Sequence, residues 1–350
     1  MALNKHGRGP VGKPIFLWSR NTPVAHPRFL WYLWPMMPTR QGSIRLFQFA
    51  GITVYLHWLW FAVAFYGITN RVRGYTSLLW PALEYLALFA LVLTHEFGHA
   101  LACRSVGGKA EQIVLWPLGG VAYVAPPPRP GPVLWSIAAG PLVNVVLAPL
   151  FLVLWALGDH AGWAESAPNA FGLLQAVCVM NLGLLAFNLL PIYPLDGGQI
   201  LQALLWFVLG RARSLMVTTA IGFVGVAGLL ALAWWTQSWW MAIVSVFILL
   251  NCWRGLAQAR LLAKLAKLPR RAGFACPACN QPPASGPYWR CAKCLKGFDT
   301  FESNATCPHC GTAYPVTQCL DCGRAHPISQ WVLPSTIPTE VHSPPAVPRT

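Results

Sequence analysis

The sequence predicts an all-α polytopic membrane protein with six transmembrane helices, a small membrane-associated β-hairpin and a small cytoplasmic cysteine-rich domain. Hydrophobic residues make up 55% of its 350 residues and charged residues only 10%, whereas soluble chains carry about 25% charged residues. Eight of the eleven cysteines lie between Cys276 and Cys322. The chain therefore contains two compositions and at least two domains.

Six apolar runs are long enough to cross roughly 30 Å of hydrocarbon, which takes about 20 residues of helix. They are predicted near residues 51–70, 78–106, 133–157, 170–193, 214–236 and 239–256. The stretch 199–209 is too short to span and is expected at the membrane interface. The 18 Trp residues are typical of aromatic belts at the two interfaces.

The net charge of +15 indicates topology. In a soluble protein it would favour nucleic acid, but here Lys and Arg cluster beside the apolar runs, as they do on the cytoplasmic side of membrane proteins. Seven precede the first run, three lie in 104–129 and six in 254–271. We therefore expect an integral protein of the plasma membrane with both termini in the cytoplasm. Membrane lipid is the expected partner and nucleic acid is not.

The second predicted span contains His95, Glu96 and His99 in the pattern His-Glu-x-x-His. Histidines four residues apart lie on one face of a helix, so both imidazoles can reach a single Zn²⁺ while the Glu between them activates water. Three titratable groups within one apolar span are costly and indicate function. The alternative is a pair of core histidines that are hydrogen-bonded to neighbouring helices.

The fourth predicted span ends in a break around Asp196, where two prolines and two glycines fall within residues 191–198. Non-helical backbone at membrane depth is tolerated only where it is buried in protein or lines a watery cavity. We therefore expect Asp196 to be a third zinc ligand beside His95 and His99. The fourth coordination position then stays open to water, as catalytic zinc requires.

The order of four separated motifs resembles the site-2 protease family of intramembrane metalloproteases over residues 45–256. The motifs are HEFGH at 95–99, GG at 119–120, GPLVN at 140–144 and NLLPIYPLDGG at 188–198. The resemblance implies a core of three helices that carry the two His, an Asn and the Asp, with one zinc buried toward the cytoplasmic side. It also implies a zinc endopeptidase that cleaves membrane-spanning proteins, with roles in regulated intramembrane proteolysis. A PDZ domain between the second and fourth spans is not apparent.

Under this hypothesis Glu96 is the general base, and Asn144 donates to the developing oxyanion or holds the substrate backbone. The alternative for Asn144 is an interhelical hydrogen bond. Residues 110–124 predict a hairpin or strand pair whose edge adds an extended substrate strand, with a packed re-entrant loop as the alternative. The candidate substrate-binding residues are Gly119, Gly120 and Asn188.

Four Cys-x-x-Cys knuckles follow the last span, and two knuckles can place four thiolates around one tetrahedral Zn²⁺. The eight cysteines are Cys276, Cys279, Cys291, Cys294, Cys307, Cys310, Cys319 and Cys322. Sequential pairing into a double zinc ribbon is favoured because only eleven and eight residues separate the paired knuckles; crossed pairing stays open. The expected total is three zinc ions, one catalytic and two structural. The ribbons lack a dense basic stripe, so we expect them to dock a protein.

Two other functions stay open. Intramembrane His and Asp also mark ion paths, which is the pattern of a zinc or other cation transporter. Zinc ribbons also suit a catalytically silent membrane adaptor that recruits partners. A Glu between two His ligands, matched to a distant LDGG, favours catalysis over transport. A silent adaptor has little need for all four of His95, Glu96, His99 and Asp196.

Five segments follow from these assignments. Residues 1–45 form a basic segment, rich in Pro and Trp, that we expect to be disordered, and 46–256 form a membrane-embedded metalloprotease domain. Residues 257–275 are a basic juxtamembrane helix or linker that fits anionic headgroups and solvent equally well. The double zinc ribbon occupies 276–325, and 326–350 form a Pro-rich tail.

Overall fold

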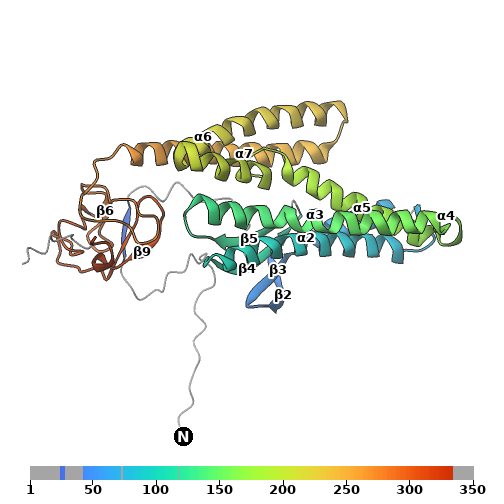
Figure 1. Cartoon of the computed structure of the whole chain (residues 1–350), viewed down its shortest axis with the longest axis horizontal. Coiled ribbons are helices and arrows are strands. Elements are labelled where there is room, and N and C mark those ends of the chain that lie inside the picture. Colours follow the sequence, from blue (N-terminus) through green and yellow to red (C-terminus); the bar gives the residue numbers. More distant parts are fainter. Residues whose placement is uncertain (1–23, 28–41, 72–73, 118, 334–350) are drawn as a thin grey trace, which may run out of the picture. The chain divides into compact units, whose positions relative to one another are not determined.

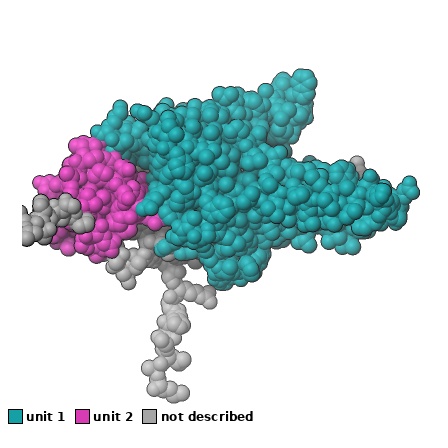
Figure 2. Space-filling view, viewed as in Figure 1, with its two compact units in different colours: residues 1–19, 30–267 teal, residues 20–29, 268–350 magenta. Residues whose placement is uncertain are grey.

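The computed structural model describes residues 24–27, 42–71, 74–117 and 119–333. It divides into two compact units, residues 1–19 with 30–267 and residues 20–29 with 268–350 (Figure 2). We call the described parts of these the membrane unit and the cysteine unit. Residues 24–27 and 43–45 lie in strands, which differs from the disorder expected for 1–45. The rest of 1–41 and the tail beyond 333 lie outside the described residues.

Long apolar helices dominate the membrane unit (Figure 1). They are α1 (Leu59–Arg71), α2 (Leu79–Ser105), α3 (Pro130–His160), α5 (Pro168–Leu189), α6 (Asp196–Trp235) and α7 (Trp239–Ala266), with the single turn α4 (Trp163–Ser166). Among the described residues, five helices are long and apolar enough to cross a membrane: α2, α3, α5, α6 and α7. Their large apolar side chains face outward, as for Val208, Val224 and Trp234 at 85%, 75% and 80% exposure. Such a surface is stable in lipid and not in water.

The first predicted span is not a single helix. Residues 52–57 form strand β3, and α1 has 13 residues, which at 1.5 Å per residue is about 20 Å long. The run Ile52-Thr53-Val54-Tyr55 is β-branched and aromatic, and such residues favour a strand. Six spanning helices are therefore replaced by five, preceded by a strand and a short helix.

The stretch expected at the interface, 199–209, belongs to α6. This helix runs from Asp196 to Trp235 with one break at Gly210, where φ is 75°. That positive φ is open to glycine and strained for other residues. The predicted interfacial stretch and the fifth predicted span are thus the two halves of one kinked helix.

A four-stranded sheet packs against α2. Its order is β2 (Ser43–Phe49), β3 (Ile52–His57), β4 (Lys109–Trp116) and β5 (Gly119–Ala125). Strands β3 and β4 are parallel, and the other two pairs are antiparallel. The hairpin predicted for residues 110–124 is therefore confirmed as β4 and β5. Buried Ile52 and Val54 of β3 pack with Val92 and Ala100 of α2.

The cysteine unit is built on a second sheet with strand order β7-β6-β1-β8-β9. The strands are β6 (Trp289–Arg290), β7 (Gly297–Phe298), β8 (Val316–Gln318), β9 (Ala325–His326) and β1 (Val24–Pro27), and a 3-10 turn spans Ile328–Gln330. β1 is antiparallel to β6 and parallel to β8. The core contains Trp289, Phe301 and Trp331.

The segment predicted as a juxtamembrane linker, 257–275, is divided between the two units. α7 continues to Ala266, whereas Arg270 and Arg271 belong to the cysteine unit. Arg270 pairs with Asp321 at 2.6 Å, and Arg271 pairs with the buried Asp299 at 2.6 Å. These ion pairs make residues 270–271 part of the cysteine fold.

Candidate metal centre

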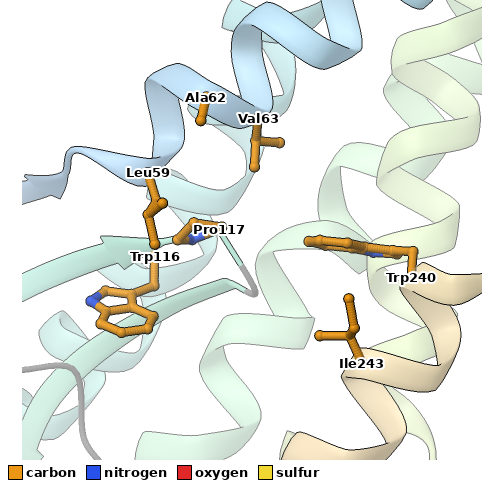
Figure 3. Close-up of a pocket in the computed structure, with 7 residues that line it drawn as sticks. All are labelled: Leu59, Ala62, Val63, Trp116, Pro117, Trp240 and Ile243. Carbon is orange, nitrogen blue, oxygen red and sulfur yellow. The ribbon is translucent and has the colours of Figure 1, made fainter.

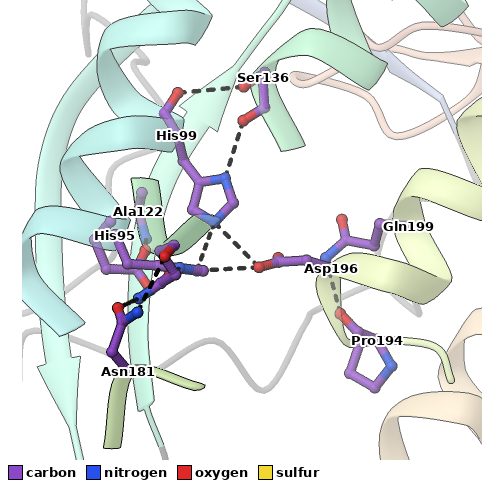
Figure 4. Close-up of polar contacts among 10 residues, drawn as sticks. His95, His99, Ala122, Ser136, Asn181, Pro194, Asp196 and Gln199 are labelled. Atoms are coloured by element: carbon purple, nitrogen blue, oxygen red, sulfur yellow. Dashed lines mark hydrogen bonds and ion pairs between the residues drawn. The ribbon is translucent and has the colours of Figure 1, made fainter. Parts of the chain in front are cut away.

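Three ligand atoms from two distant parts of the chain meet inside the membrane unit (Figure 4). His95 and His99 lie one turn apart on α2, and Asp196 is the first residue of α6. The Nε2 atom of His95 lies 3.0 Å from Asp196 Oδ2 and 3.1 Å from His99 Nε2. His99 Nε2 lies 3.4 Å from Asp196 Oδ2. Neighbouring ligands of a tetrahedral Zn²⁺, at bond lengths of about 2.0–2.1 Å, lie about 3.3 Å apart. The three atoms therefore fit zinc.

Hydrogen bonds to the Nδ1 atoms of His95 and His99 orient the two rings so that their Nε2 atoms face this centre. His95 Nδ1 lies 2.7 Å from Asn144 Oδ1, and His99 Nδ1 lies 2.9 Å from the carbonyl oxygen of Ser136. Both partners accept, so each Nδ1 carries the proton and each Nε2 presents a lone pair. Two lone pairs and a carboxylate oxygen at this distance repel one another unless a cation or a proton lies between them. The donor set thus fits a metal independently of the sequence pattern.

Asn144 on α3 is itself held by Asn181 on α5. The Asn144 side-chain amide nitrogen donates to Asn181 Oδ1 at 2.8 Å. The Asn181 side-chain amide nitrogen donates back to the backbone carbonyl oxygen of Asn144 at 3.0 Å. Both side chains are fully buried. The geometry directs the Asn144 side chain to His95 and Asn181, whereas the sequence predicted that it serves an oxyanion; that predicted role stays a prediction.

Sequence reasoning missed Ser136 and Asn181. Ser136 contributes a backbone oxygen, for which no residue pattern gives a signal. Asn181 did carry a signal, because it is an amide in the middle of the apolar run 170–189, where a polar side chain needs a partner. The predicted Asn188 lies half-buried in the last turn of α5 and takes no part in the hydrogen bonds around the ligands.

Glu96 lies beside the end strand of the sheet. Its Oε2 accepts a hydrogen bond of 2.7 Å from the backbone N–H of Ala122 on β5. The strand approaches so closely that a Cβ on Gly120 would lie 2.3 Å from Glu96 Cγ, while Gly119 has a positive φ of 135°. The predicted Gly119 and Gly120 thus sit where β5 passes the carboxylate.

A second close approach brings α3 against α2. An ideal Cβ on Gly140 would lie 2.2 Å from His99 Nε2, and one on Gly98 would lie 2.7 Å from the Ala139 carbonyl oxygen. Neither gap leaves room for a methyl group. The glycines of the HEFGH and GPLVN motifs therefore allow the two helices to meet at the ligands.

The eight tail cysteines form two clusters whose pairing differs from the favoured prediction. Cys276 and Cys279 meet Cys319 and Cys322, and the two middle knuckles meet each other. The sulfur–sulfur distances are 3.7 and 3.8 Å in the first cluster and 3.5 and 3.7 Å in the second. Tetrahedral Zn–S bonds of about 2.3 Å give about 3.8 Å, far longer than a disulfide. The arrangement is therefore nested and not sequential.

The short loop after the first knuckle explains the error. Sequential pairing requires residues 280–290 to turn back so that the second knuckle meets the first. They instead run beside the segment that precedes the first knuckle, with Arg270 bridged to Ala284 and the Arg271 N–H donating to the Pro283 carbonyl. This pairing carries the chain away from Cys276 and Cys279. Loop length alone does not reveal it.

The cluster of the two middle knuckles, which we call the inner cluster, is supported by a buried tyrosine. The hydroxyl of Tyr314 donates to Cys291 Sγ at 3.0 Å and accepts from the Ala292 N–H at 2.8 Å. Burial, and then this hydrogen bond, raise the pKa of Tyr314. The phenol therefore stays protonated and can donate to a thiolate ligand.

The fold and the site together define a membrane protein with a candidate metal centre of the His-Glu-x-x-His type. Residues 84–171 and 162–232 match the model of Peptidase family M50. This part of the chain, somewhat less than half of it, is thus similar to that family, the family of the site-2 proteases, in agreement with the resemblance found in the sequence.

Several known proteins are similar to parts of this chain. A zinc metalloprotease of Methanocaldococcus jannaschii is 35% identical over 182 residues, 51% of this chain and 50% of that protein. Stage IV sporulation protein FB of Bacillus subtilis is 29% identical over 155 residues, 43% of this chain and 46% of that protein. The structure of the site-2 protease from Methanocaldococcus jannaschii is 28% identical, covers 61% of this chain and 95% of that chain, and gives a TM-score of 0.45. The chain spans about half the length of the curated relatives it matches.

Proposed function

We propose that this protein is an intramembrane zinc endopeptidase that hydrolyses peptide bonds of membrane-spanning substrates. The observation that carries the proposal is the convergence of three acceptor atoms, from His95, His99 and Asp196. The buried carboxylate of Glu96 follows His95 directly in the chain. When bound, zinc supplies a Lewis acid that polarises a carbonyl oxygen and makes water acidic. Glu96 takes the proton of the attacking water and returns it to the leaving nitrogen.

The substrate strand is proposed to lie beside β5. A helical segment hides its peptide bonds, so it must first become extended, and an extended segment can add to the end strand of a sheet. β5 is the end strand of the sheet, and its Ala122 N–H points away from β4 to Glu96. A segment added along β5 passes the carboxylate that handles the proton. Gly119, Gly120 and Asn188 remain the proposed substrate contacts.

An apolar groove lies beside the same hairpin (Figure 3). Its volume is about 350 Å³, and it lies between α1, the turn after β4 and α7. The lining residues are Leu59, Ala62, Val63, Trp116, Pro117, Trp240 and Ile243. A groove without charged side chains suits a membrane-embedded substrate and not a soluble one.

The proposed location is the plasma membrane with both termini in the cytoplasm, supported by the distribution of Lys and Arg. We further propose three zinc ions, one at the membrane site and two at the nested cysteine clusters, and a protein partner at the cysteine unit. A cation transporter is less favoured, because a transported ion needs no carboxylate held against a strand edge. A silent adaptor would need neither Glu96 nor the ligands.

The test compares the wild type with Glu96→Gln in the organism's own membranes. Membrane proteins that accumulate with the variant and are cut by the wild type are the substrates, and loss of the general base should slow cleavage about 10²–10⁴-fold. Glu96 is no ligand, so the membrane-site zinc should remain. Glu111→Gln, the same change at an exposed position of β4, is the matched control. Wild-type cleavage by purified Glu96→Gln protein would refute the proposal.

A further inference from the structure

The loop between α5 and α6 delivers the third ligand, and it is buried in a second layer of helices. Ile192 of this loop is 7% exposed and forms a core cluster with Val226 of α6 and with Ile248 and Cys252 of α7. These contacts come from helix segments that lie more than 25 residues beyond Asp196. The position of the loop is therefore set by α7 and by the distal part of α6, which contribute none of the ligands or their hydrogen-bond partners.

Ile192 packs against α6 at Gly225, and we call the place that its side chain occupies its seat. Only a glycine at residue 225 leaves room for it. An ideal Cβ on Gly225 would lie 2.4 Å from Ile192 Cγ1 and 2.5 Å from its Cδ1. Carbon atoms that are not bonded approach to about 3.5 Å. Any side chain at Gly225 must push Ile192 out of its seat.

The next residue, Tyr193, is held in the same way on α7. A Cβ on Gly255 would lie 2.8 Å from Tyr193 Cε1. The thiol of Cys252 donates to the Tyr193 carbonyl oxygen at 2.9 Å, and a Cβ on Gly222 would lie 2.7 Å from the same sulfur. Three glycines on α6 and α7 thus form a seat for two consecutive loop residues.

Only Pro194 and Leu195 connect this seat to Asp196, and short contacts hold this connection in place. The Leu195 N–H donates to the Ile192 carbonyl at 2.8 Å, and the Gln199 side-chain amide donates to the Pro194 carbonyl at 2.8 Å (Figure 4). A Cβ on Gly198 would lie 2.5 Å from the Ile192 carbonyl carbon. A displacement of Ile192 is therefore transmitted to Asp196.

We propose that Ile192 and Tyr193, in their seat at Gly222, Gly225 and Gly255, are the positioning residues for Asp196. The α6–α7 pair then sets the affinity and geometry of the membrane-site metal, although its packing residues touch neither metal nor substrate. This inference rests on the proposed function, because it assumes that Asp196 is a ligand.

The experiment uses full-length protein purified in detergent and loaded with Co²⁺. A site of nitrogen and oxygen ligands lacks the sulfur-to-metal charge-transfer absorption of the cysteine sites, so the visible spectrum separates the two kinds of site. Gly225→Leu should weaken Co²⁺ binding at the membrane site at least about tenfold, the range seen when groups that orient metal ligands are removed. The cysteine-site absorption should not change.

Gly228→Leu is the matched control, one turn further on the same helix, where nothing lies within 4 Å of an ideal Cβ. It should bind Co²⁺ like the wild type. The double change Gly225→Leu with Ile192→Ala removes the clash and should recover part of the lost affinity. Equal affinity in Gly225→Leu and Gly228→Leu would overturn the inference.

A second pair of variants decides the matter if Gly225→Leu does not fold. Ile192→Val keeps most of the side chain in its seat and should bind Co²⁺ like the wild type, whereas Ile192→Ala should weaken binding and shift the visible bands. Identical spectra and affinities for these two would also overturn the inference. A wild type without any nitrogen–oxygen site would instead overturn the proposed function, together with this consequence.

Discussion

At the scale of single residues, the amide of Asn144 connects the proposed ligand His95 to a third helix. Its oxygen accepts from His95 Nδ1 and its nitrogen donates to Asn181, so one buried side chain fixes both the tautomer and the ring plane of His95. Groups that orient a ligand in this way raise metal affinity. An oxyanion donor would act on the rate of catalysis instead.

Asn181→Ala separates these two roles. Without Asn181 the Asn144 amide is free to rotate, and its oxygen no longer has a fixed direction toward His95. We expect the membrane-site zinc to bind about 10–100-fold more weakly. Asn169→Ala at the start of the same helix is the control, since Asn169 donates to Thr76 and stands outside this set of hydrogen bonds. Unchanged zinc affinity combined with a lower kcat would favour the oxyanion role for Asn144.

At the scale of elements, hydropathy was sufficient for the helices and insufficient for the strand that precedes them. The runs predicted at 78–106 and 133–157 became α2 and α3 with shifts of only one to three residues, because each is longer than the strands of a sheet. Residues 51–57 are as apolar as a helix, but they pair with β2 and β4 on both sides. That pairing depends on residues 109–116, which a local pattern does not include.

The same reasoning explains which parts of the site were predictable. His95, Glu96 and His99 lie in one helix with a fixed spacing, so their common face follows from the sequence. Asp196 was found by its break in an apolar run. The Ser136 carbonyl and the seat of Ile192 depend on how helices cross, and the decisive atoms there are backbone oxygens and absent side chains. Their positions are tertiary properties.

Gly140→Ala tests the crossing of α2 and α3. The added methyl would overlap His99 Nε2, the ligand atom itself, so α3 must shift or His99 must turn away. We expect loss of the membrane-site zinc while the cysteine sites stay loaded. Gly131→Ala on the same helix is the control, because its nearest contact would be an ordinary 4.0 Å. Full zinc retention in Gly140→Ala would show that the crossing is looser than the structure has it.

At the scale of the whole membrane unit, β3 and α1 together run beside α2. Arg104 near the end of α2 donates to the carbonyls of Ala50 and Gly51, and at its other end Glu84 pairs with Arg71 at 2.9 Å. Residues 50–71 thus extend from one end of α2 to the other. A paired, buried strand satisfies its backbone groups at membrane depth as a helix would.

This arrangement predicts six crossings, the first made of a strand and a short helix. An even number of crossings places both termini on the same side, and the distribution of Lys and Arg makes that side the cytoplasm. Reporters fused after Thr350 should report cytoplasm, and reporters inserted at 161–162, between α3 and α4, should report the opposite side. A carboxyl-terminal reporter found outside would leave five crossings and refute the assignment of β3 and α1.

The nested cysteine clusters predict which pairs of substitutions cost one zinc and which cost two. Structural zinc contributes folding free energy directly, so a cluster that loses one thiolate should release its metal. Cys276→Ser combined with Cys319→Ser removes two ligands of one cluster, and the full chain should fall from three zinc ions to two. Cys276→Ser combined with Cys307→Ser removes one ligand from each cluster, and the zinc content should fall to one. Sequential pairing predicts two lost ions for the first double variant, so elemental analysis of the purified proteins distinguishes the two arrangements. In both double variants one of the ions that remain should be held by His95, His99 and Asp196, and adding His95→Ala should lower the zinc content by one.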